Sequence, residues 1–337
     1  MERPELSVII PIFNEAAVID ELRRRLAEVM GKLDSQVRSW EVVFIDDGSR
    51  DESLAMLRQM AASEARFKVV SFARNFGHQL AITAGLDMAE GDAVVIMDAD
   101  LQDPPEVVIE MLARWRQGFD VVYGVRRTRA GETFLKKATA SLFYRLLRWS
   151  LGGVSIPVDA GDFRLVSRPV VLTMRALRER HRFVRGMVAW VGFKQSPLFY
   201  DREARFPGET KYPFTKMLRF AIDAITSFST LPLRLASWLG VGTAIVAVVY
   251  ALFVVYVKVF LGGVVQGWTT IMIAVALGTS AQLFMTGILG EYVGRIYEEN
   301  KRRTLYITAE LLNFDEREPG PSSRYTGGRA NLPSRHD

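Results

Sequence analysis

Residues 93–106 read AVVIMDADLQDPPE, an uninterrupted apolar run that leads directly into a cluster of acidic residues. An apolar run without polar alternation predicts a β-strand that is buried on both faces. The Pro-Pro pair ends the strand and predicts that a helix begins there, with Asp103 as its N-cap. We therefore expect Asp98 and Asp100 at the carboxyl end of a central strand, where open α/β sheets bind their ligands.

Asp98, Asp100 and Gln102 offer oxygen atoms at alternate positions of this stretch. Carboxylate and amide oxygens are hard ligands for Mg²⁺ or Mn²⁺, and a pyrophosphate could complete the octahedron. The simpler alternative is a polar strand-to-helix turn with a helix cap, because acidic turns are common. Motifs elsewhere in the chain favour the metal site.

The composition limits the class of protein. The chain has 337 residues, which suits a catalytic domain with an appended segment. It contains no cysteine, so disulfides and thiolate metal sites are excluded. The net charge of +5 fits anionic lipid or a phosphorylated substrate as well as nucleic acid; we expect no nucleic-acid partner. The first five residues lead into a short strand, so we expect no cleavable signal peptide and a cytoplasmic N-terminal part.

Apolar strands alternate with amphipathic helices through the first part of the chain. We expect strands at 6–13, 41–45, 67–72 and 120–124 in addition to the stretch above, and helices at 16–33, from 51 onward and at about 80–89. This alternation predicts an α/β fold with a mostly parallel, doubly wound sheet and helices on both faces. The polar clusters follow strands, so we expect them to converge on one edge of the sheet.

The second strand ends in a doubled aspartate, Asp46-Asp47, followed by Gly48 and Ser49. Gly48 permits close approach of the backbone, and a carboxylate can accept hydrogen bonds from a base N–H or from ribose hydroxyls. A turn with a helix cap would explain the aspartate, glycine and serine, but not the doubled aspartate. The chain lacks both G-x-G-x-x-G and G-x-x-x-x-G-K-[ST], which argues against a dinucleotide-binding dehydrogenase and excludes a P-loop NTPase.

Three motifs occur in an order that resembles glycosyltransferase family 2: VIIPIFNE at 8–15, DDGS at 46–49 and DADLQDPPE at 98–106. The Asp-Ala-Asp-Leu-Gln variant and RNFG at 74–77 are similar to the branch that acts on polyprenyl phosphates, which includes dolichyl-phosphate mannose synthase. The resemblance extends over about residues 5–300. It implies a GT-A fold, a nucleotide-sugar donor and a polyprenyl-phosphate acceptor.

The resemblance also implies roles for individual residues. The donor-binding residues would be Pro11, Asn14, Glu15, Asp46, Asp47, Gly48, Ser49, Arg74, Asn75, Asp98 and Ala99. The ligands of Mg²⁺ or Mn²⁺ would be Asp98, Asp100 and Gln102. The catalytic residues would be Asp100 and, at the base position in the segment DAGDFR at 159–164, Asp162 or Asp159. The same segment would place Arg164 on the acceptor side. From their places after strand ends or beside a Pro-Gly turn, near the expected membrane-surface helices, we expect the acceptor phosphate to be held also by Arg126, Arg127, Arg205 and Lys211; the alternative is that these four only attract anionic lipid.

The role of Asp162 has two alternatives. It could simply pair with Arg164, since Asp–Arg pairs are frequent in loops. It could also orient the acceptor rather than abstract a proton from it. The acceptor is a phosphate monoester that is already an anion near neutral pH, so it needs positioning more than deprotonation.

Four apolar or amphipathic segments indicate contact with a membrane. Amphipathic helices are expected at about 133–150 and 213–230 on an anionic membrane surface, with packing on the sheet as the alternative. The segments 235–261 and 268–290 are long and apolar enough to span a bilayer, with a buried hydrophobic hairpin as the alternative. Basic residues flank this pair of segments but are absent from the loop at 262–267, which places both termini in the cytoplasm.

These segments define three parts of the chain. We expect a cytoplasmic GT-A domain at 1–230, a two-helix anchor in the cytoplasmic (inner) membrane at 231–295, and a cytoplasmic segment at 296–337 that is disordered from about 315. Small residues in the spans suit helix–helix contact, so we also expect a homo-oligomer, for example a tetramer.

The predicted activity is transfer of a hexose from a nucleotide sugar, most simply a UDP-sugar such as UDP-glucose, to a polyprenyl phosphate. Inversion at the anomeric carbon is implied by the resemblance alone. A processive polysaccharide synthase is one alternative, but Arg145 stands where its Gln-x-x-Arg-Trp motif needs glutamine before Arg148-Trp149. A non-catalytic, membrane-anchored protein that binds nucleotide sugars is another.

Overall fold

The structure is a computed structural model that describes residues 3–127, 160–201, 231–260 and 267–314. It divides into two compact units. The described parts of the first unit are residues 3–127, 160–201 and 303–314, and those of the second are 231–260 and 267–302. The amphipathic helices expected at 133–150 and 213–230 lie outside the described residues, as does the segment from 315 onward.

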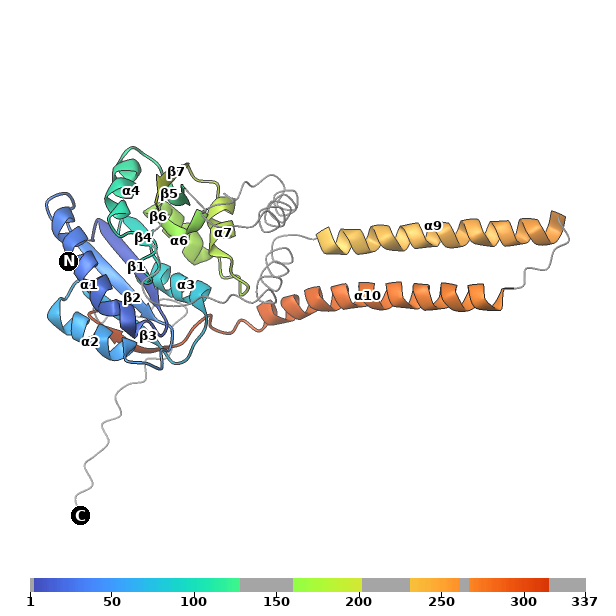
Figure 1. Cartoon of the computed structure of the whole chain (residues 1–337), viewed down its shortest axis with the longest axis horizontal. Helices are drawn as coiled ribbons and strands as arrows, with labels where there is room; N and C mark the ends of the chain where they lie inside the picture. Colours follow the sequence, from blue (N-terminus) through green and yellow to red (C-terminus); the bar gives the residue numbers. More distant parts are fainter. Residues whose placement is uncertain (1–2, 128–159, 202–230, 261–266, 315–337) are drawn as a thin grey trace, which may run out of the picture. The chain divides into compact units, whose positions relative to one another are not determined.

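The described residues of the first unit form one eight-stranded sheet in the order β7-β5-β6-β4-β1-β2-β3-β8 (Figure 1). Its strands are β1 (Leu6–Ile12), β2 (Trp40–Asp46), β3 (Phe67–Phe72), β4 (Ala93–Ile96), β5 (Val121–Arg126), β6 (Ala160–Ser167), β7 (Gln195–Tyr200) and β8 (Thr308–Leu312). The central strands β4, β1, β2 and β3 are parallel neighbours, with Ile9 opposite Val43 on one side and Ile96 on the other. The predicted α/β fold is confirmed, and these strands carry the predicted motifs.

Both sides of the sheet contain antiparallel strands. β6 runs antiparallel to β4 and β5, and β8 runs antiparallel to β3, whereas β5 and β7 are parallel. The sheet is therefore mixed, and its parallel part is the centre. β6, β7 and β8 were not predicted, because they lie away from the strand–helix alternation of the first part of the chain.

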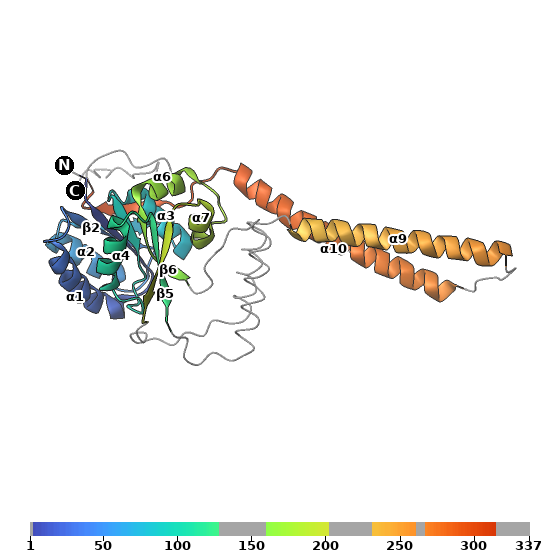
Figure 2. The same ribbon diagram turned by 90° about the horizontal axis from the view of Figure 1, so that it is seen from above.

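Helices cover both faces of the sheet (Figure 2). On one face lie α1 (Ala16–Leu33), α2 (Ser53–Ser63) and α4 (Val107–Arg116), whose apolar residues join Val8 and Ile10 in one core. On the other lie α3 (His78–Met88), α6 (Arg168–Ala176) and α7 (Val184–Trp190). Gly85 lets α3 approach β1 closely, since a Cβ there would lie 2.1 Å from Cγ2 of Ile9.

Helix α4 starts later than the sequence predicts. It begins at Val107 with Glu106 as its N-cap residue, so the prediction of Asp103 as the cap is wrong. The Asp103 carboxylate, which is buried, instead accepts a hydrogen bond from the hydroxyl of Tyr200 at the end of β7. Asp103 thus bonds to Tyr200, which lies far along the chain, and does not cap the helix as the local sequence pattern predicts.

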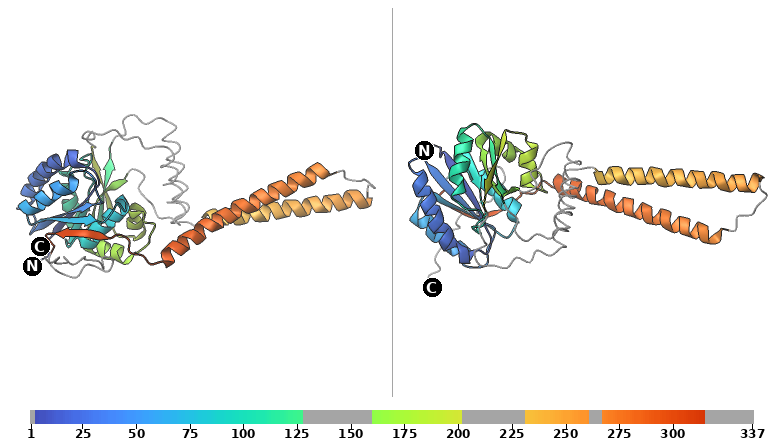
Figure 3. Two further views of the ribbon diagram at one scale, coloured as in Figure 1. Left: turned by 90° about the horizontal axis from the view of Figure 1, so that it is seen from below. Right: turned by 45° about the horizontal axis from the view of Figure 1, so that its top comes forward.

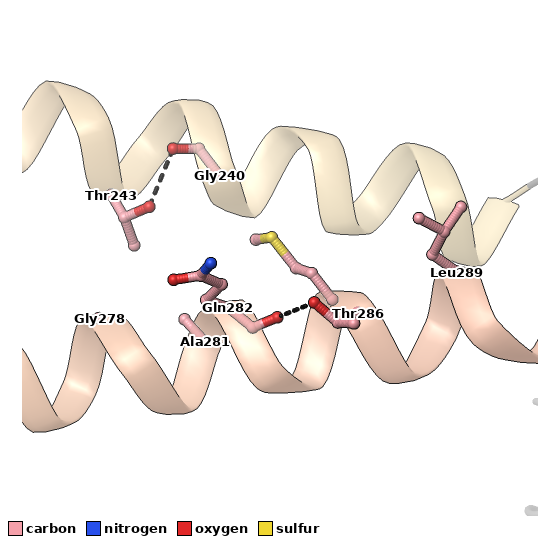
Figure 4. A pocket seen from close by; sticks show the side chains of 8 residues that line it. Gly240, Thr243, Gly278, Ala281, Gln282, Thr286 and Leu289 are labelled. Carbon is pink, nitrogen blue, oxygen red and sulfur yellow. Dashed lines mark hydrogen bonds between the residues drawn. The ribbon is translucent and has the colours of Figure 1, made fainter.

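The second unit contains two long helices, α9 (Leu231–Phe260) and α10 (Trp268–Asn300), which run side by side (Figure 3). Both are long and apolar enough to cross a membrane, over Leu235–Phe260 and Thr270–Asn300. The second helix extends ten residues beyond the predicted limit of 290, because helical structure continues past the apolar run into polar residues. A cavity of about 300 Å³ between the helices is lined by small, polar and apolar residues, including Gly278, Gln282 and Leu289 (Figure 4).

The chain after α10 returns to the first unit. Residues 303–314 pack with the sheet, where β8 pairs with β3. The segment expected to follow the spans as a separate tail thus begins with an element of the sheet.

Candidate functional site

The loops after β1 and β2 are tied to each other by backbone-to-side-chain hydrogen bonds. The Asn14 amide donates to Oγ of Ser49 at 3.0 Å, and the Arg50 amide donates to Oδ1 of Asn14 at 2.8 Å. Asn14 has a φ of 55°, a left-handed conformation that asparagine tolerates better than most residues. The Glu15 amide donates to Oγ of Ser53 at 2.9 Å. Together with buried Pro11 in β1, these contacts fix the start of the predicted donor side.

Asp47 holds the loop after β3. Its carboxylate is 3% exposed and accepts hydrogen bonds from Nδ2 of Asn75 at 3.0 Å and from the amides of Phe76 and Gly77 at 2.6 and 2.9 Å. Burial raises the pKa of Asp47 even though the two amides lower it, and the neighbouring Asp46 charge raises it further. These three hydrogen bonds therefore fix the loop after β3 to Asp47; we call this set of contacts the brace.

Asp46 and Gly48 complete the brace. Asp46 is fully buried and accepts hydrogen bonds from Oγ of Ser71 at 2.9 Å and from the Ser49 amide at 3.1 Å. Gly48 has a φ of 68°, and a Cβ there would lie 2.5 Å from the backbone carbon of Arg74. Only glycine fits this contact, so the predicted residues after β2 and β3 are brought together.

Asp98, His78 and Asp162 meet beyond the carboxyl end of β4. His78 is the first residue of α3, and its Nε2 lies 3.5 Å from Oδ1 of Asp98 and 3.4 Å from Oδ2 of Asp162. Asp162 lies near the start of β6, which pairs with β4. Arg185 of α7 donates to both Asp162 oxygens, from Nε at 2.8 Å and from Nη2 at 3.1 Å. A carboxylate–imidazole–carboxylate row with a bidentate arginine therefore forms at this edge.

Burial and neighbouring side chains shift the pKa values of Asp98, His78 and Asp162. Burial alone would raise the pKa of Asp162, but hydrogen bonds from His78 and Arg185 hold it far below its usual range. Burial also raises the pKa of Asp98 to about 6, with His78 opposing the rise and Asp162 adding to it. Burial would lower the pKa of His78, yet its contacts with Asp162 and Asp98 raise it. Asp162 is therefore an anchor for cations and a poor proton acceptor.

Arg164 is buried behind this row. It donates to the carbonyl oxygens of Gly161 at 2.7 Å and of Asp162 at 3.3 Å. Burial lowers the pKa of Arg164 to about 10, so it remains a cation near neutral pH. The side chain of Asp162 makes its bidentate pair with Arg185 rather than with Arg164. Burial of the Arg164 guanidinium gives the predicted acceptor contact no support and favours a structural role.

Asp98 and Asp100 are the residues that fit a divalent cation. The Asp98 side chain is one-third exposed. The Asp100 carboxylate accepts a hydrogen bond from the backbone amide of Gln102 at 3.2 Å. Among the described residues no group of three or more histidine, aspartate or glutamate side chains could hold a metal ion. A diphosphate would have to supply further ligands, and a cation beside Asp98 would remove the cost of its ionisation.

The remaining candidates lie near β5 and β7 or outside the described residues. Arg126 ends β5, and its buried Nε has no hydrogen-bond partner among the residues that the structure describes. Arg127 is 60% exposed and pairs with exposed Asp201 at 3.4 Å. Three predicted residues lie outside the described ranges: Asp159, Arg205 and Lys211.

Two residues of the site carried no predicted role. His78 directly follows the RNFG motif and is one of three histidines in the chain, which is the signal that could have indicated it. Arg185 lies in a short helix without a recognisable motif, and only the fold brings it to Asp162.

Comparison with known proteins gives the family. The model of glycosyl transferase family 2 matches residues 7–174. An uncharacterized glycosyltransferase of Bacillus subtilis is 46% identical over 93% of this chain and 96% of its own length. A bactoprenol glucosyl transferase of Shigella phage SfV is 37% identical over 90% of this chain and 97% of its own. A solved structure, glucosyl-3-phosphoglycerate synthase from Mycobacterium tuberculosis with Mn²⁺ and uridine diphosphate, shares 20% identity over 66% of this chain and 78% of its own, at a TM-score of 0.43. The chain belongs to glycosyltransferase family 2.

Proposed function

We propose that this protein transfers a hexose from a nucleoside diphosphate sugar to a polyprenyl phosphate. The observation that carries the proposal is the 37% identity to a bactoprenol glucosyl transferase over nearly the whole length of both chains. A UDP-sugar such as UDP-glucose is the donor we favour. The site at the carboxyl ends of β1, β2 and β4 is where an open α/β sheet binds a nucleotide.

The donor side would bind and orient the nucleotide sugar. Asp98 and Asp100 would hold Mg²⁺ or Mn²⁺, which when bound offsets the charge of a leaving diphosphate as a Lewis acid. Asp47 keeps the loop that contains Asn75 in place through three hydrogen bonds. His78 contacts Asp98 and is the first residue of α3, so the N-terminus of this helix lies at the same edge of the sheet as Asp98.

The acceptor side would hold an anion and leave its oxygen free to attack. An oxygen of the lipid phosphate forms the new bond to the anomeric carbon, and the bond from that carbon to the diphosphate oxygen breaks, with inversion. The diphosphate leaves with the electron pair. Asp162 is ionised and paired with Arg185 and His78, so it orients these two side chains and takes no proton. A phosphate monoester needs no base to be nucleophilic near neutral pH.

Membrane association of this domain follows from α9 and α10 and from the chain's path. The sheet contains residues before the first candidate span and, in β8, residues after the second. A folded sheet lies on one side of a bilayer, so the chain between must cross an even number of times. This supports two spans with the catalytic unit and both termini in the cytoplasm. Small residues in membrane spans suit close helix–helix contact, so the homo-oligomer stays part of the proposal.

The test is donor consumption by the detergent-solubilised full chain with a panel of nucleotide sugars, with and without undecaprenyl phosphate. We expect release of the nucleoside diphosphate that requires the lipid and yields one sugar per lipid. A polymeric product would instead indicate a processive synthase. Nucleotide-sugar binding without consumption for every donor would show that the chain is a binding protein, and the proposal would be wrong.

A further inference from the structure

The chain that leaves the second candidate span is built into the catalytic unit. We call residues 301–314 the return segment; in Figure 3 its strand is red and lies along the sheet. Leu305 and Tyr306 are buried, at 9% and 1% exposure, within five or six residues of the end of α10 at Asn300. β8 then pairs with β3, with Val70 opposite Leu311 and Phe72 opposite Thr308. Only a few residues of the chain therefore connect the second candidate span to the sheet; we call this connection the tie.

Tyr306 is the centre of this tie. Its ring stacks on Phe72 with centroids 5.1 Å apart and an interplanar angle of 18°. Its hydroxyl donates to Oδ2 of Asp87 at 2.9 Å, and Asp87 also binds both terminal nitrogens of Arg178, at 2.8 and 3.0 Å. A buried tyrosine with its ring stacked and its hydroxyl bonded is fixed at both ends. Tyr306 therefore adds a fixed surface against the last residue of β3.

The loop that follows β3 rests on this surface. The Ala73 amide donates to the Ile307 carbonyl oxygen at 2.9 Å, where the pairing of β3 and β8 shifts register. Phe76 packs edge-on against Phe72, with centroids 5.5 Å apart at 85°. The opposite side of the same loop is held by Asp47, and the loop ends at His78. Two independent clamps, one from β2 and one from the return segment, fix residues 73–77.

We propose that Tyr306 is a positioning residue for the donor side of the site. Through Phe72 and the Ala73 amide, the return segment sets the place of the loop at 73–77 and hence of Asn75 and His78. The inference rests on the proposed function, because it assigns these two residues to donor binding. It also means that the second span and the donor loop are joined through one short stretch of chain.

The test compares Tyr306→Leu and Tyr306→Phe with Glu310→Gln as a matched control. Leucine fills the apolar space but loses the stack and the hydroxyl, whereas phenylalanine loses only the bond to Asp87. Glu310 lies in the same return segment, within β8, but it pairs with half-exposed Arg58 away from the loop. We expect Tyr306→Leu to raise the donor KM about tenfold, the cost of losing a contact of about 1.4 kcal/mol, while the acceptor KM stays unchanged. The effect of Tyr306→Phe should be smaller, and Glu310→Gln should match wild type.

Amide hydrogen exchange of the peptide that spans residues 73–79 gives a readout that needs no substrate. It should be faster in Tyr306→Leu than in wild type and Glu310→Gln, with β1 and β2 unchanged as the control for folding. An unchanged exchange rate in folded Tyr306→Leu would overturn the inference, as would an equal rise of the donor and acceptor KM. If wild type uses no donor, the proposed function fails, and the exchange rates still decide whether Tyr306 holds the loop. If Tyr306→Leu does not fold, the same comparison with Tyr306→Phe decides.

Discussion

Asp47 and Asp162 are two buried carboxylates at the same edge of the sheet, and their pKa values shift in opposite directions. They are 3% and 5% exposed. Asp47 accepts hydrogen bonds from neutral amides, and burial raises its pKa. Burial would also raise the pKa of Asp162, but contacts with His78 and Arg185 lower it. The charge of the hydrogen-bond partners, and not the degree of burial, decides the direction.

The opposite pKa shifts of Asp47 and Asp162 reflect a difference between the donor side and the acceptor side of the site. The donor side is a set of loops that follow parallel strands, braced by neutral hydrogen bonds and with its cation supplied, in our proposal, by a metal ion. The acceptor side is built on antiparallel β6 and on α7, and it contains its own cations. An Asp162 that stays ionised near neutral pH suits a residue that holds Arg185 for an anionic acceptor, and it does not suit a general base.

We expect the largest loss of activity from substitutions that remove the predicted metal ligands on the donor side. Asp98→Asn and Asp100→Asn should each lower kcat about a thousandfold or more, because a bound metal contributes several kcal/mol of charge stabilisation. A chelator should do the same to wild type, measured as release of nucleoside diphosphate. Asp92→Asn is the matched control, since Asp92 precedes the same strand at its other end and pairs with exposed Arg38. Full activity in chelator would exclude the metal from the reaction.

The next effect tests the acceptor side. Asp162→Asn and Arg185→Met should each lower kcat/KM on the order of a hundredfold, because both release the same bidentate contact and misplace the acceptor. Loss of one partner of this partly buried ion pair should also destabilise the fold, which a lower Tm would show. The double variant should be no worse than either single variant, since the two residues act as one unit. If Asp162 were a base, its loss would exceed that of Arg185 and the two losses would add.

A smaller effect separates two neighbouring arginines. Arg126→Ala should raise the KM for polyprenyl phosphate about tenfold, as expected for lost hydrogen bonds to a charged group, with the donor KM unchanged. Arg127 is exposed and already paired with Asp201, so Arg127→Ala should change the acceptor KM less than about twofold in neutral detergent. Equal defects that disappear in neutral detergent would show that both residues only attract anionic lipid.

The donor side could be predicted from the sequence because its geometry follows chain order. Apolar runs locate β1, β2, β3 and β4, and parallel strands bring the residues after each run to one edge. Asp47 and Asp98 could therefore be placed together without a structure. The brace itself was not predictable: nothing in the sequence shows that Asp47 points to the amides of Phe76 and Gly77 rather than to a ligand.

The acceptor side, and the contacts that support the site from outside it, could not be predicted from local patterns, because they join residues that are distant in sequence. Asp162 and Arg185 are 23 residues apart, Asp103 and Tyr200 are 97 apart, and Asp87 and Tyr306 are 219 apart. β6, β7 and β8 lie outside the alternation of strands and helices that marked the centre of the sheet. Strands that join the sheet in this way, β6 and β8 antiparallel to their central neighbours and β7 parallel to β5, leave no local pattern, since their partners are set by packing.

The last and smallest effect is the response of stability to acid, and it tests the comparison directly. The pKa of Asp162 in the fold lies below its unfolded value of about 3.9, so its contribution to stability is complete above that pH and is lost as the pH falls below it. The pKa of Asp47 in the fold lies above its unfolded value, so its term favours the fold at low pH and is lost as the pH rises through the folded pKa.

The measurement is the apparent Tm of wild type, Asp162→Asn and Asp47→Asn in detergent, from neutral pH down to about pH 3, which passes below the unfolded pKa of aspartate. On acidification, the difference between wild type and Asp162→Asn should narrow, whereas the difference between wild type and Asp47→Asn should widen. Asparagine at position 47 cannot accept from all three donors, but that loss is the same at every pH and leaves the slope unchanged. If both differences moved in the same direction, partner charge would not be what distinguishes the two sides of the site.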